Sequence, residues 1–273
     1  MNYGLCTSMF AEERLNSHIL DKILAAGLCH FEIMAARQHL DYHDVNQVRD
    51  VAQWFSDHAV TLHCLHAPIY NDWNWGRSGG LLVSVANLER RARIASMDEI
   101  KRAIEVAEHL PFRYLVLHLG VPDEAYDLRK FDAAFTSIEH LSLFAKERGT
   151  QILLENIPSE LSSPEHILRF LQYTRLDLKI CFDAGHAHLT GGIDAAFRAL
   201  HERIAVVHLH DNHGEKDEHL LPYEGAIDWA QAVPGFRAAG EQFPVLFELS
   251  WERNEPNVLA RIREVTDRFA NIP

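Results

Sequence analysis

Histidines and acidic residues crowd into one short stretch of the chain, HLHDNHGEKDEHLLPYEG at residues 208–225. Its 18 positions hold four histidines, three glutamates and two aspartates. Imidazoles and carboxylates are the side chains that bind divalent metal ions and transfer protons near neutral pH. A solvated polar loop can have the same composition, so the rest of the chain must decide between a loop and a site.

Histidines and acidic residues also end a series of short apolar runs, such as LVLH, ILLE, ICFD and AVVH. A charged group at the end of such a run is costly to bury unless it is paired or bound to a metal. One such residue is usually a hydrogen-bonded core residue. Three carboxylates that face one another would repel, however, and a cation between them removes that repulsion. Six runs end in this way, at His66, His118, Glu155, Asp183, His208 and Glu248.

Three more candidate ligands are predicted to lie in loops after these run ends. His186 lies three residues after Asp183 in FDAGHAH. Asp217 and His219 lie two residues apart, so both can point the same way from an extended loop. One divalent ion takes about four to six ligands. The nine candidates, with one bridging carboxylate, could therefore hold up to three ions.

Other polar residues near the candidates are predicted to support the ligands or to face solvent. His63 is out of phase with His66 on the same run, and Asp211 is out of phase with His208. Asp211 is therefore predicted to orient a neighbour or to cap a turn. The histidines predicted to lie outside the ligand set are His63, His188, His210 and His213.

The elements that must position these residues alternate along the chain. Apolar runs rich in β-branched and aromatic residues predict strands buried on both faces, and amphipathic stretches between them predict helices. Strand then helix, eight times at intervals of about thirty residues, is typical of a (β/α)8 TIM barrel. A doubly wound open sheet is the alternative, but no GxGxxG follows the first strand. In a barrel the six run ends would lie together at one rim, where catalytic groups are found.

No linker or composition shift divides the chain, so residues 1–273 are predicted to form a single domain. The predicted strands are 3–9, 30–35, 61–68, 113–120, 151–157, 178–185, 205–211 and 244–251. The predicted helices are 18–27, 44–58, 88–110, 128–148, 163–173, 193–200, 228–239 and 256–270.

The composition of the chain indicates where the protein is located and which partners it does not bind. Lys and Arg total 26 against 39 for Asp and Glu, a formal net charge of -13, which repels nucleic acid and anionic membranes. No apolar stretch reaches the length of a transmembrane helix, and no signal peptide is recognisable. The four cysteines, Cys6, Cys29, Cys64 and Cys181, form no CxxC pair and are predicted to be reduced thiols of the core. We therefore expect a cytoplasmic protein without membrane association. A homo-oligomer is compatible with this composition.

The sequence resembles the xylose isomerase-like TIM barrels, and the resemblance covers essentially the whole chain. That superfamily includes sugar and sugar-phosphate isomerases and epimerases, inosose-metabolising enzymes and endonuclease IV. The segments that carry the resemblance are HAP at 66–68, LHLG at 117–120, LLEN at 153–156, FDAGH at 182–186, HLHDN at 208–212, DEHLLPYEGAIDW at 217–229 and FELSW at 247–251.

Two branches of that superfamily imply different chemistry. The resemblance to ketose 3-epimerases implies one ion on Glu155, Asp183, His208 and Glu248, with the two glutamates as proton carriers and His186 holding the substrate. The resemblance to endonuclease IV implies three zinc ions on all nine candidates, with Glu155 bridging two ions and His186, Asp217 and His219 holding the third. The implied cofactor is a divalent metal, zinc first and manganese or cobalt as alternatives.

The chain departs from both branches. The epimerases usually carry an arginine six residues after the histidine of the seventh strand, where this chain has Gly214. Endonuclease IV needs basic loops that grip DNA, whereas the loops after the first two predicted strands are short and the chain is acidic. The stretch NDWNWGRSGG at 71–80 could supply aromatic stacking and one arginine to DNA, but the favoured interpretation is a lid over a sugar site.

The favoured function is a metal-dependent isomerase or epimerase of a small sugar or sugar phosphate, and nucleic acid is not the expected partner. Glu155 and Glu248 would transfer the proton next to a carbonyl that the metal polarises. One alternative is an endonuclease IV-like multinuclear zinc phosphodiesterase or phosphatase. The other is a barrel that binds metal or sugar without catalysis.

Overall fold

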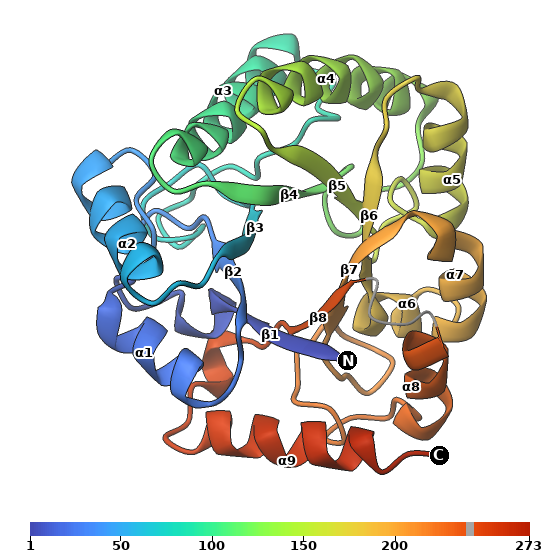
Figure 1. Cartoon of the computed structure of the whole chain (residues 1–273). Coiled ribbons are helices and arrows are strands. Elements are labelled where there is room, and N and C mark those ends of the chain that lie inside the picture. The colour runs from blue at the N-terminus through green and yellow to red at the C-terminus, as the bar shows by residue number, and fades with distance from the viewer. Residues whose placement is uncertain (239–242) are drawn as a thin grey trace.

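Eight parallel strands close into a barrel at the centre of the molecule (Figure 1). The computed structural model of the protein describes residues 1–238 and 243–273, apart from the side chain of Arg253. Each strand pairs with the next, and β8 pairs with β1 to close the ring, with Asn2 opposite Pro244. The strands are β1 (Asn2–Cys6), β2 (His30–Met34), β3 (Leu62–His66), β4 (Phe112–His118), β5 (Gln151–Glu155), β6 (Lys179–Asp183), β7 (Ile204–Leu209) and β8 (Pro244–Phe247).

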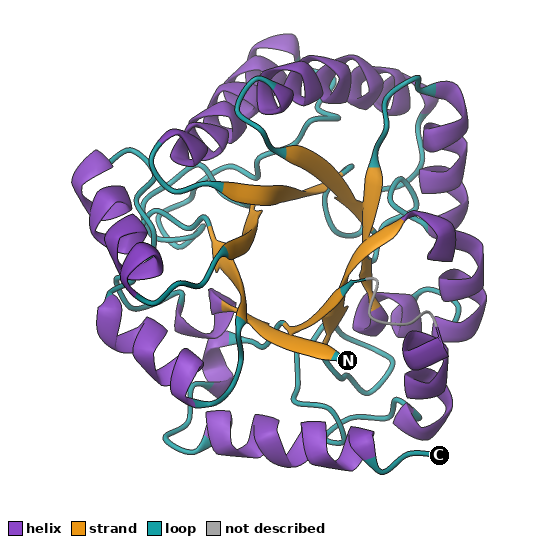
Figure 2. Cartoon of the chain, viewed as in Figure 1, coloured by secondary structure: helices purple, strands orange, loops and turns teal. Residues whose placement is uncertain are grey.

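Helices surround the barrel on its outside (Figure 2). They are α1 (Ser17–Ala25), α2 (Val45–Asp57), α3 (Arg90–Glu105), α4 (Leu128–Lys146), α5 (Pro164–Tyr173), α6 (Ala184–Leu189), α7 (Ile193–Leu200), α8 (Trp229–Ala238) and α9 (Val258–Ala270). Short 3-10 turns are η1 (Thr7–Phe10), η2 (Val106–Glu108), η3 (His201–Arg203) and η4 (Trp251–Arg253). The predicted (β/α)8 TIM barrel is confirmed. The last residue of the predicted helix 228–239 lies outside the described residues.

One helix near the site is absent from the sequence prediction. Helix α6 follows β6 directly and carries His186, which the sequence placed in a loop. The Asp183 side chain caps this helix by accepting a hydrogen bond from the His186 backbone N–H at 2.6 Å. The helix has six residues, including Gly185, which has a low helix propensity. Such a short element depends on its cap and on tertiary packing, so periodicity does not reveal it.

The side chains inside the barrel are apolar in its middle and polar at the rim formed by the C-terminal ends of the strands. The apolar layer includes Cys64, Val116, Leu153, Cys181 and Val206. Residues two positions apart on a strand share a face, so the next inward residues on these strands are the histidines and carboxylates at the run ends. The apolar layer therefore forms a floor of low polarity directly below the polar rim.

Outside the barrel, large apolar side chains such as Phe31, Phe182, Phe236 and Trp229 pack between the strands and the helices. All four cysteines are free thiols, and Cys6, Cys64 and Cys181 are buried as expected of core thiols. Cys29 is exposed, so its predicted place in the core is wrong. Among the described helices, none has both the length and the apolar character needed to cross a bilayer.

Candidate metal centre

All nine predicted ligands converge at the C-terminal rim of the barrel, in three groups. Within each group, one ligand atom per residue lies within 4.8 Å of every other. The histidine group is His66, His118 and Glu155; the central group is Glu155, Asp183, His208 and Glu248; the loop group is His186, His210, Asp217 and His219.

Glu155 belongs to both the histidine group and the central group, and each of its carboxylate oxygens faces one of them. Its Oε2 lies 3.3 Å from His66 Nε2 and 3.2 Å from His118 Nε2. Its Oε1 lies 3.3 Å from His208 Nδ1. The carboxylate is therefore oriented as a bridge between two neighbouring positions.

The central group is almost completely shielded from solvent. Glu155, Asp183 and His208 have no accessible surface, and Glu248 is 4% exposed. His208 Nδ1 lies 3.2 Å from Glu248 Oε2 and 3.9 Å from Asp183 Oδ2. Three carboxylates thus surround one imidazole nitrogen above the apolar floor.

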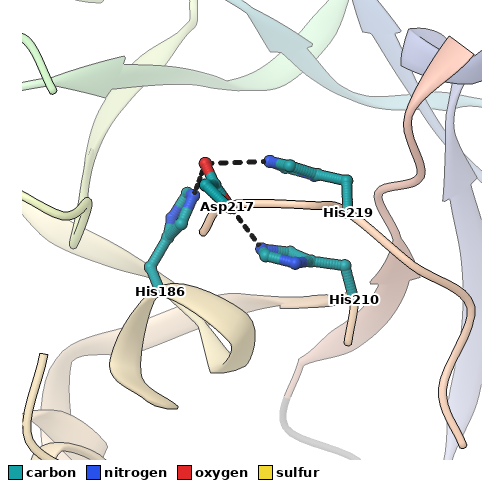
Figure 3. A group of neighbouring side chains, drawn as sticks. All are labelled: His186, His210, Asp217 and His219. Carbon is teal, nitrogen blue, oxygen red and sulfur yellow. Dashed lines mark hydrogen bonds and ion pairs between the residues drawn. The ribbon is translucent and has the colours of Figure 1, made fainter. Parts of the chain in front are cut away.

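The loop group joins three elements that are separate in the sequence (Figure 3). His186 comes from α6, His210 follows β7, and Asp217 and His219 come from the loop between β7 and α8. Asp217 Oδ2 lies 3.0 Å from His186 Nε2 and 3.3 Å from His219 Nε2, and its Oδ1 lies 3.7 Å from His210 Nε2. All three rings point toward the Asp217 carboxylate in Figure 3.

Backbone carbonyl groups orient three of the histidine rings. The Nδ1 atoms of His66, His186 and His219 lie 2.9, 3.0 and 2.9 Å from the carbonyl oxygens of Ala67, Asn156 and Glu248, respectively. Each ring can donate Nδ1–H to its carbonyl and turn Nε2 toward its group. This arrangement is common for metal-binding histidines, because the outer hydrogen bond fixes both the tautomer and the ring angle.

A buried glutamate outside the predicted ligand set orients His208. Glu32 on β2 has no accessible surface, and both its oxygens lie 3.1 Å from His208 Nε2. His208 therefore turns Nδ1 toward the central group and Nε2 toward Glu32. Because Glu32 points inward on its strand just below the rim, strand parity is the signal that could have revealed it.

Asp211 holds the loop that carries Asp217 and His219. Its side chain accepts hydrogen bonds from Tyr223 N at 2.9 Å, Ile227 N at 3.1 Å and Trp229 Nε1 at 2.8 Å. This contact pattern confirms the prediction that Asp211 orients neighbouring residues. The stretch 208–225 thus contains both candidate ligands and the residue that anchors their loop.

The predictions for the other histidines differ in outcome. His213 is 60% exposed and pairs with Glu218, as expected for a solvent-facing residue. His63 and His188 are partly buried and stand outside the three groups. His210, by contrast, is completely buried and lies in the loop group, beside three residues that the sequence predicts to be ligands. It lies two residues after His208, so the two side chains leave the extended chain on the same side.

Ion pairing controls the protonation of these residues when no metal is present. Burial lowers the pKa of His66, but the surrounding carboxylates, Glu155 foremost, together outweigh burial and raise this pKa to about 9. Burial also lowers the pKa of His219, but the Asp217 carboxylate outweighs burial and raises this pKa to about 9. Burial would raise the pKa of Glu155, yet the surrounding histidines, His208 foremost, hold it well below its usual range. The rim is therefore a network of ion pairs between carboxylates and imidazolium groups.

The residues present fit a divalent cation. Several buried polar atoms of the described residues make no hydrogen bond, including Glu155 Oε2, Asp183 Oδ2 and both ring nitrogens of His210. Each unsatisfied buried group costs about 1–3 kcal/mol. A cation would satisfy these atoms and remove the repulsion among the carboxylates, and mixed nitrogen and oxygen ligands suit zinc or manganese.

A cavity of about 200 Å³ lies beside the centre and is bounded by Glu248, Asp217 and His219. Its apolar walls include Met34, Ile69, Trp75 and Trp251. Trp75 comes from the predicted lid stretch 71–80, and Arg77 in that stretch contacts Glu12 and stacks 5.2 Å above the Trp251 ring. The stretch therefore reaches the segment after β8 and covers one side of the cavity.

The amino-acid sequence matches the profile of one protein family. Residues 20–269 match the profile described as "Xylose isomerase-like TIM barrel". The chain belongs to this family. The match begins within α1 and ends within α9, so it covers strands β2 to β8 and includes every residue of the three groups.

The relatives of the chain include uncharacterized proteins and a probable endonuclease. The chain is 29% identical over 235 residues to "Uncharacterized protein MJ1614" of Methanocaldococcus jannaschii, covering 84% of this chain and 85% of that one. It is 26% identical over 218 residues to "Probable endonuclease 4" of Natronomonas pharaonis, covering 70% and 76% of the two chains. A match to "Uncharacterized protein y4fM" of Sinorhizobium fredii, at 27% identity, covers 59% of this chain and 55% of that protein.

Solved structures share the xylose isomerase-like fold over their full length. A D-tagatose 3-epimerase-like protein has a TM-score of 0.82 at 23% identity and covers 100% of this chain and 98% of its own. The IOLI protein, whose structure contains a zinc atom, has a TM-score of 0.79 at 16% identity, with 98% of each chain covered. At these identities the likeness establishes the fold.

Proposed function

We propose that this protein is a divalent-metal-dependent isomerase or epimerase of a small sugar. The observation that carries the proposal is the position of Glu248, which belongs to the central group and also lines the 200 Å³ cavity. One carboxylate is thus shared between the metal ligands and the space for a substrate. The cavity is smaller than the about 300–1,000 Å³ typical of drug-sized ligands, so it suits a small molecule.

Glu155, Asp183, His208 and Glu248 would hold the catalytic ion. A bound ion supplies a Lewis acid that makes the proton next to a carbonyl easier to remove. Zinc is our first choice of metal, with manganese or cobalt as alternatives.

Glu248 is the proposed proton carrier nearest the substrate, because its side chain reaches the cavity wall. Glu155 is the second proton carrier, and the change in its protonation is shared with His66, His118 and His208. We assign His186 to the loop group rather than to the substrate, because its Nε2 faces Asp217 and its Nδ1 faces the Asn156 carbonyl. General acid and base groups of this kind typically contribute about 10²–10⁴-fold to a rate.

The cavity walls favour an unphosphorylated sugar over a sugar phosphate. Indole faces such as those of Trp75 and Trp251 can pack against the C–H groups of a sugar ring. Among the described residues that line the cavity, none is a Lys or Arg that could pair with a phosphate. Two of the structural neighbours, the D-tagatose 3-epimerase-like protein and the zinc-containing IOLI protein, are consistent with this proposal.

The proposal is tested by solvent proton exchange. Metal-loaded protein is incubated in deuterated water with a panel of ketoses and ketose phosphates, and deuterium at the carbons next to the carbonyl is followed by NMR. We expect exchange and a new epimer or isomer with at least one unphosphorylated ketose. Absence of exchange across the panel, with metal content confirmed, would overturn the proposal.

A second candidate is a phosphodiesterase or phosphatase with several metal ions. The bridging orientation of Glu155 between two groups favours it, as does the relative named "Probable endonuclease 4". The net charge of -13 opposes a DNA substrate, because DNA binding depends on neutralising phosphates. Hydrolysis of a small phosphate diester or of an abasic duplex, without ketose exchange, would establish this candidate instead.

A further inference from the structure

His210 has no role in the sugar chemistry proposed above, yet it is one of the most enclosed histidines of the rim. It has no accessible surface, and neither ring nitrogen makes a hydrogen bond within the described residues. Its Nε2 lies 3.0 Å from Asp183 Oδ1, an ion-pair distance without hydrogen-bond geometry. Buried imidazoles are normally hydrogen-bonded, so an unsatisfied one indicates a missing partner.

The backbone beside His210 leaves space for its ring. A Cβ atom at position 185 would lie 2.1 Å from His210 Cε1 and 2.5 Å from Nε2, so any residue other than Gly185 would clash with the ring. Helix α6 therefore comes close enough for His186 and His210 to meet only because position 185 has no side chain.

The ligand atoms of the loop group have the spacing of one coordination site. Asp217 oxygens lie 3.0, 3.3 and 3.7 Å from the Nε2 atoms of His186, His219 and His210. Two ligands of one tetrahedral zinc with bonds of about 2.1 Å lie about 3.4 Å apart. The His210 and His219 rings stack at 3.8 Å, and both point toward Asp217 (Figure 3).

We propose that His210 is a fourth protein ligand of the loop group and makes it a closed metal position with a structural role. Zinc with four protein ligands is typically structural, whereas catalytic zinc keeps one position open for water or substrate. The ion would join α6, the end of β7 and the loop that supplies Asp217 and His219. Since both loop residues line the cavity, the ion would hold one cavity wall in place.

This inference rests on the proposal that the rim binds divalent metal, but not on the reaction. Its test is His210→Asn, with His213→Asn as the matched control, because His213 lies in the same stretch and its side chain is 60% exposed. Each protein is stripped, reloaded with Zn(II), dialysed and analysed for metal per chain. A second sample is loaded with Co(II), whose visible absorption is intense when four ligands surround it tetrahedrally.

We expect His210→Asn to lose about one ion per chain on dialysis and to lose the tetrahedral Co(II) bands of the loop group, whereas the control retains both. The loss of affinity should exceed the about 10–100-fold caused by removing a residue that only supports a ligand. Unchanged metal content and an unchanged Co(II) spectrum in His210→Asn would overturn the proposal.

A second variant covers the case in which His210→Asn does not fold. Gly185→Ala keeps all four ligands and displaces only the His210 ring, so it should weaken the same ion and change the same Co(II) bands. Bands unaffected by Gly185→Ala would also contradict the proposal. Since neither readout uses a substrate, tetrahedral bands in a protein without ketose exchange would refute the proposed function alone.

Discussion

The central group and the loop group have the same ligand chemistry, but the fold holds them in different ways. All four residues of the central group lie at or next to the ends of barrel strands, whose spacing the hydrogen-bonded sheet fixes. The loop group depends on a six-residue helix and on a loop that Asp211 anchors. The barrel therefore keeps the central group assembled whether or not an ion is bound, whereas the loop group needs further support.

The two groups also differ in their exposure. Glu155, Asp183 and His208 have no accessible surface, whereas the side chains of Asp217 and His219 are 35% and 23% exposed. Solvent can reach the loop group when no ion occupies it, and its loop can open at lower cost. Removal of metal should therefore loosen the loop while the barrel stays folded.

The largest effect is expected from Glu155→Gln, which removes the charge that the histidine group and the central group share. We expect ketose exchange to fall by at least about 10²–10⁴-fold, the usual contribution of a proton-transfer group, while the fold remains. Exchange rate, metal content and circular dichroism are measured together, with the exposed Glu165→Gln as control. Substantial turnover in the metal-loaded variant would remove the assigned role of Glu155.

The double variant Asp217→Ala/His219→Ala tests whether the loop group binds an ion independently of the central group. We expect one metal ion fewer per chain and a lower melting temperature, because an ion that binds only the folded protein stabilises it. The ion of the central group should remain, since none of its four ligands is changed. Unchanged metal content would show that the loop group holds no ion, and loss of every ion would show that the two groups are not independent.

The fold was predictable because the barrel repeats one simple pattern. Runs such as QILLE and KICFD are nearly continuous in apolar residues, as expected for strands covered on both faces. The strand ends then follow from parity. Leu153 faces the barrel interior, so Glu155 two residues later faces it too, and the same holds for Cys181 and Asp183.

The site was predictable only where the strands determine it. His210 was placed outside the ligand set because it lies just beyond the end of β7, although its two-residue spacing from His208 was a signal that the two side chains share a face. Glu32 was missed because two apolar residues follow it in HFEIM, so it does not mark a strand end. Helix α6 and the convergence of Asp217 on His186 depend on long-range contacts that no local pattern encodes.

Glu32→Gln should weaken the central group without changing the loop group. The carboxylate of Glu32 orients His208 and increases its basicity, and loss of such a partner typically costs about 10–100-fold in metal affinity. Competition with a chromophoric chelator gives the affinity of each ion. An equal loss at both groups would indicate a general disturbance of the barrel, and no loss at the central group would show that Glu32 does not position His208.

The smallest effect expected is a pH dependence of metal binding, which we expect at both the histidine group and the loop group. The pKa of His66 and that of His219 are each about 9 without metal, so both rings are protonated at neutral pH. Their ion pairs stabilise the metal-free fold below the unfolded pKa of about 6.5, and this contribution is lost as the pH rises through 9. A metal ion must displace these protons, so its apparent affinity should rise about tenfold per pH unit for each proton displaced, up to about pH 9. Titrations at pH 6.5, 7.5 and 8.5 measure the slope, and His219→Asn should lower it at the loop group alone. Part of the slope remains there, because the burial of His186 is outweighed by Asp183 and Asp217, which raise the pKa of His186 as well. An unchanged slope in His219→Asn would mean that His219 is already neutral in the metal-free protein.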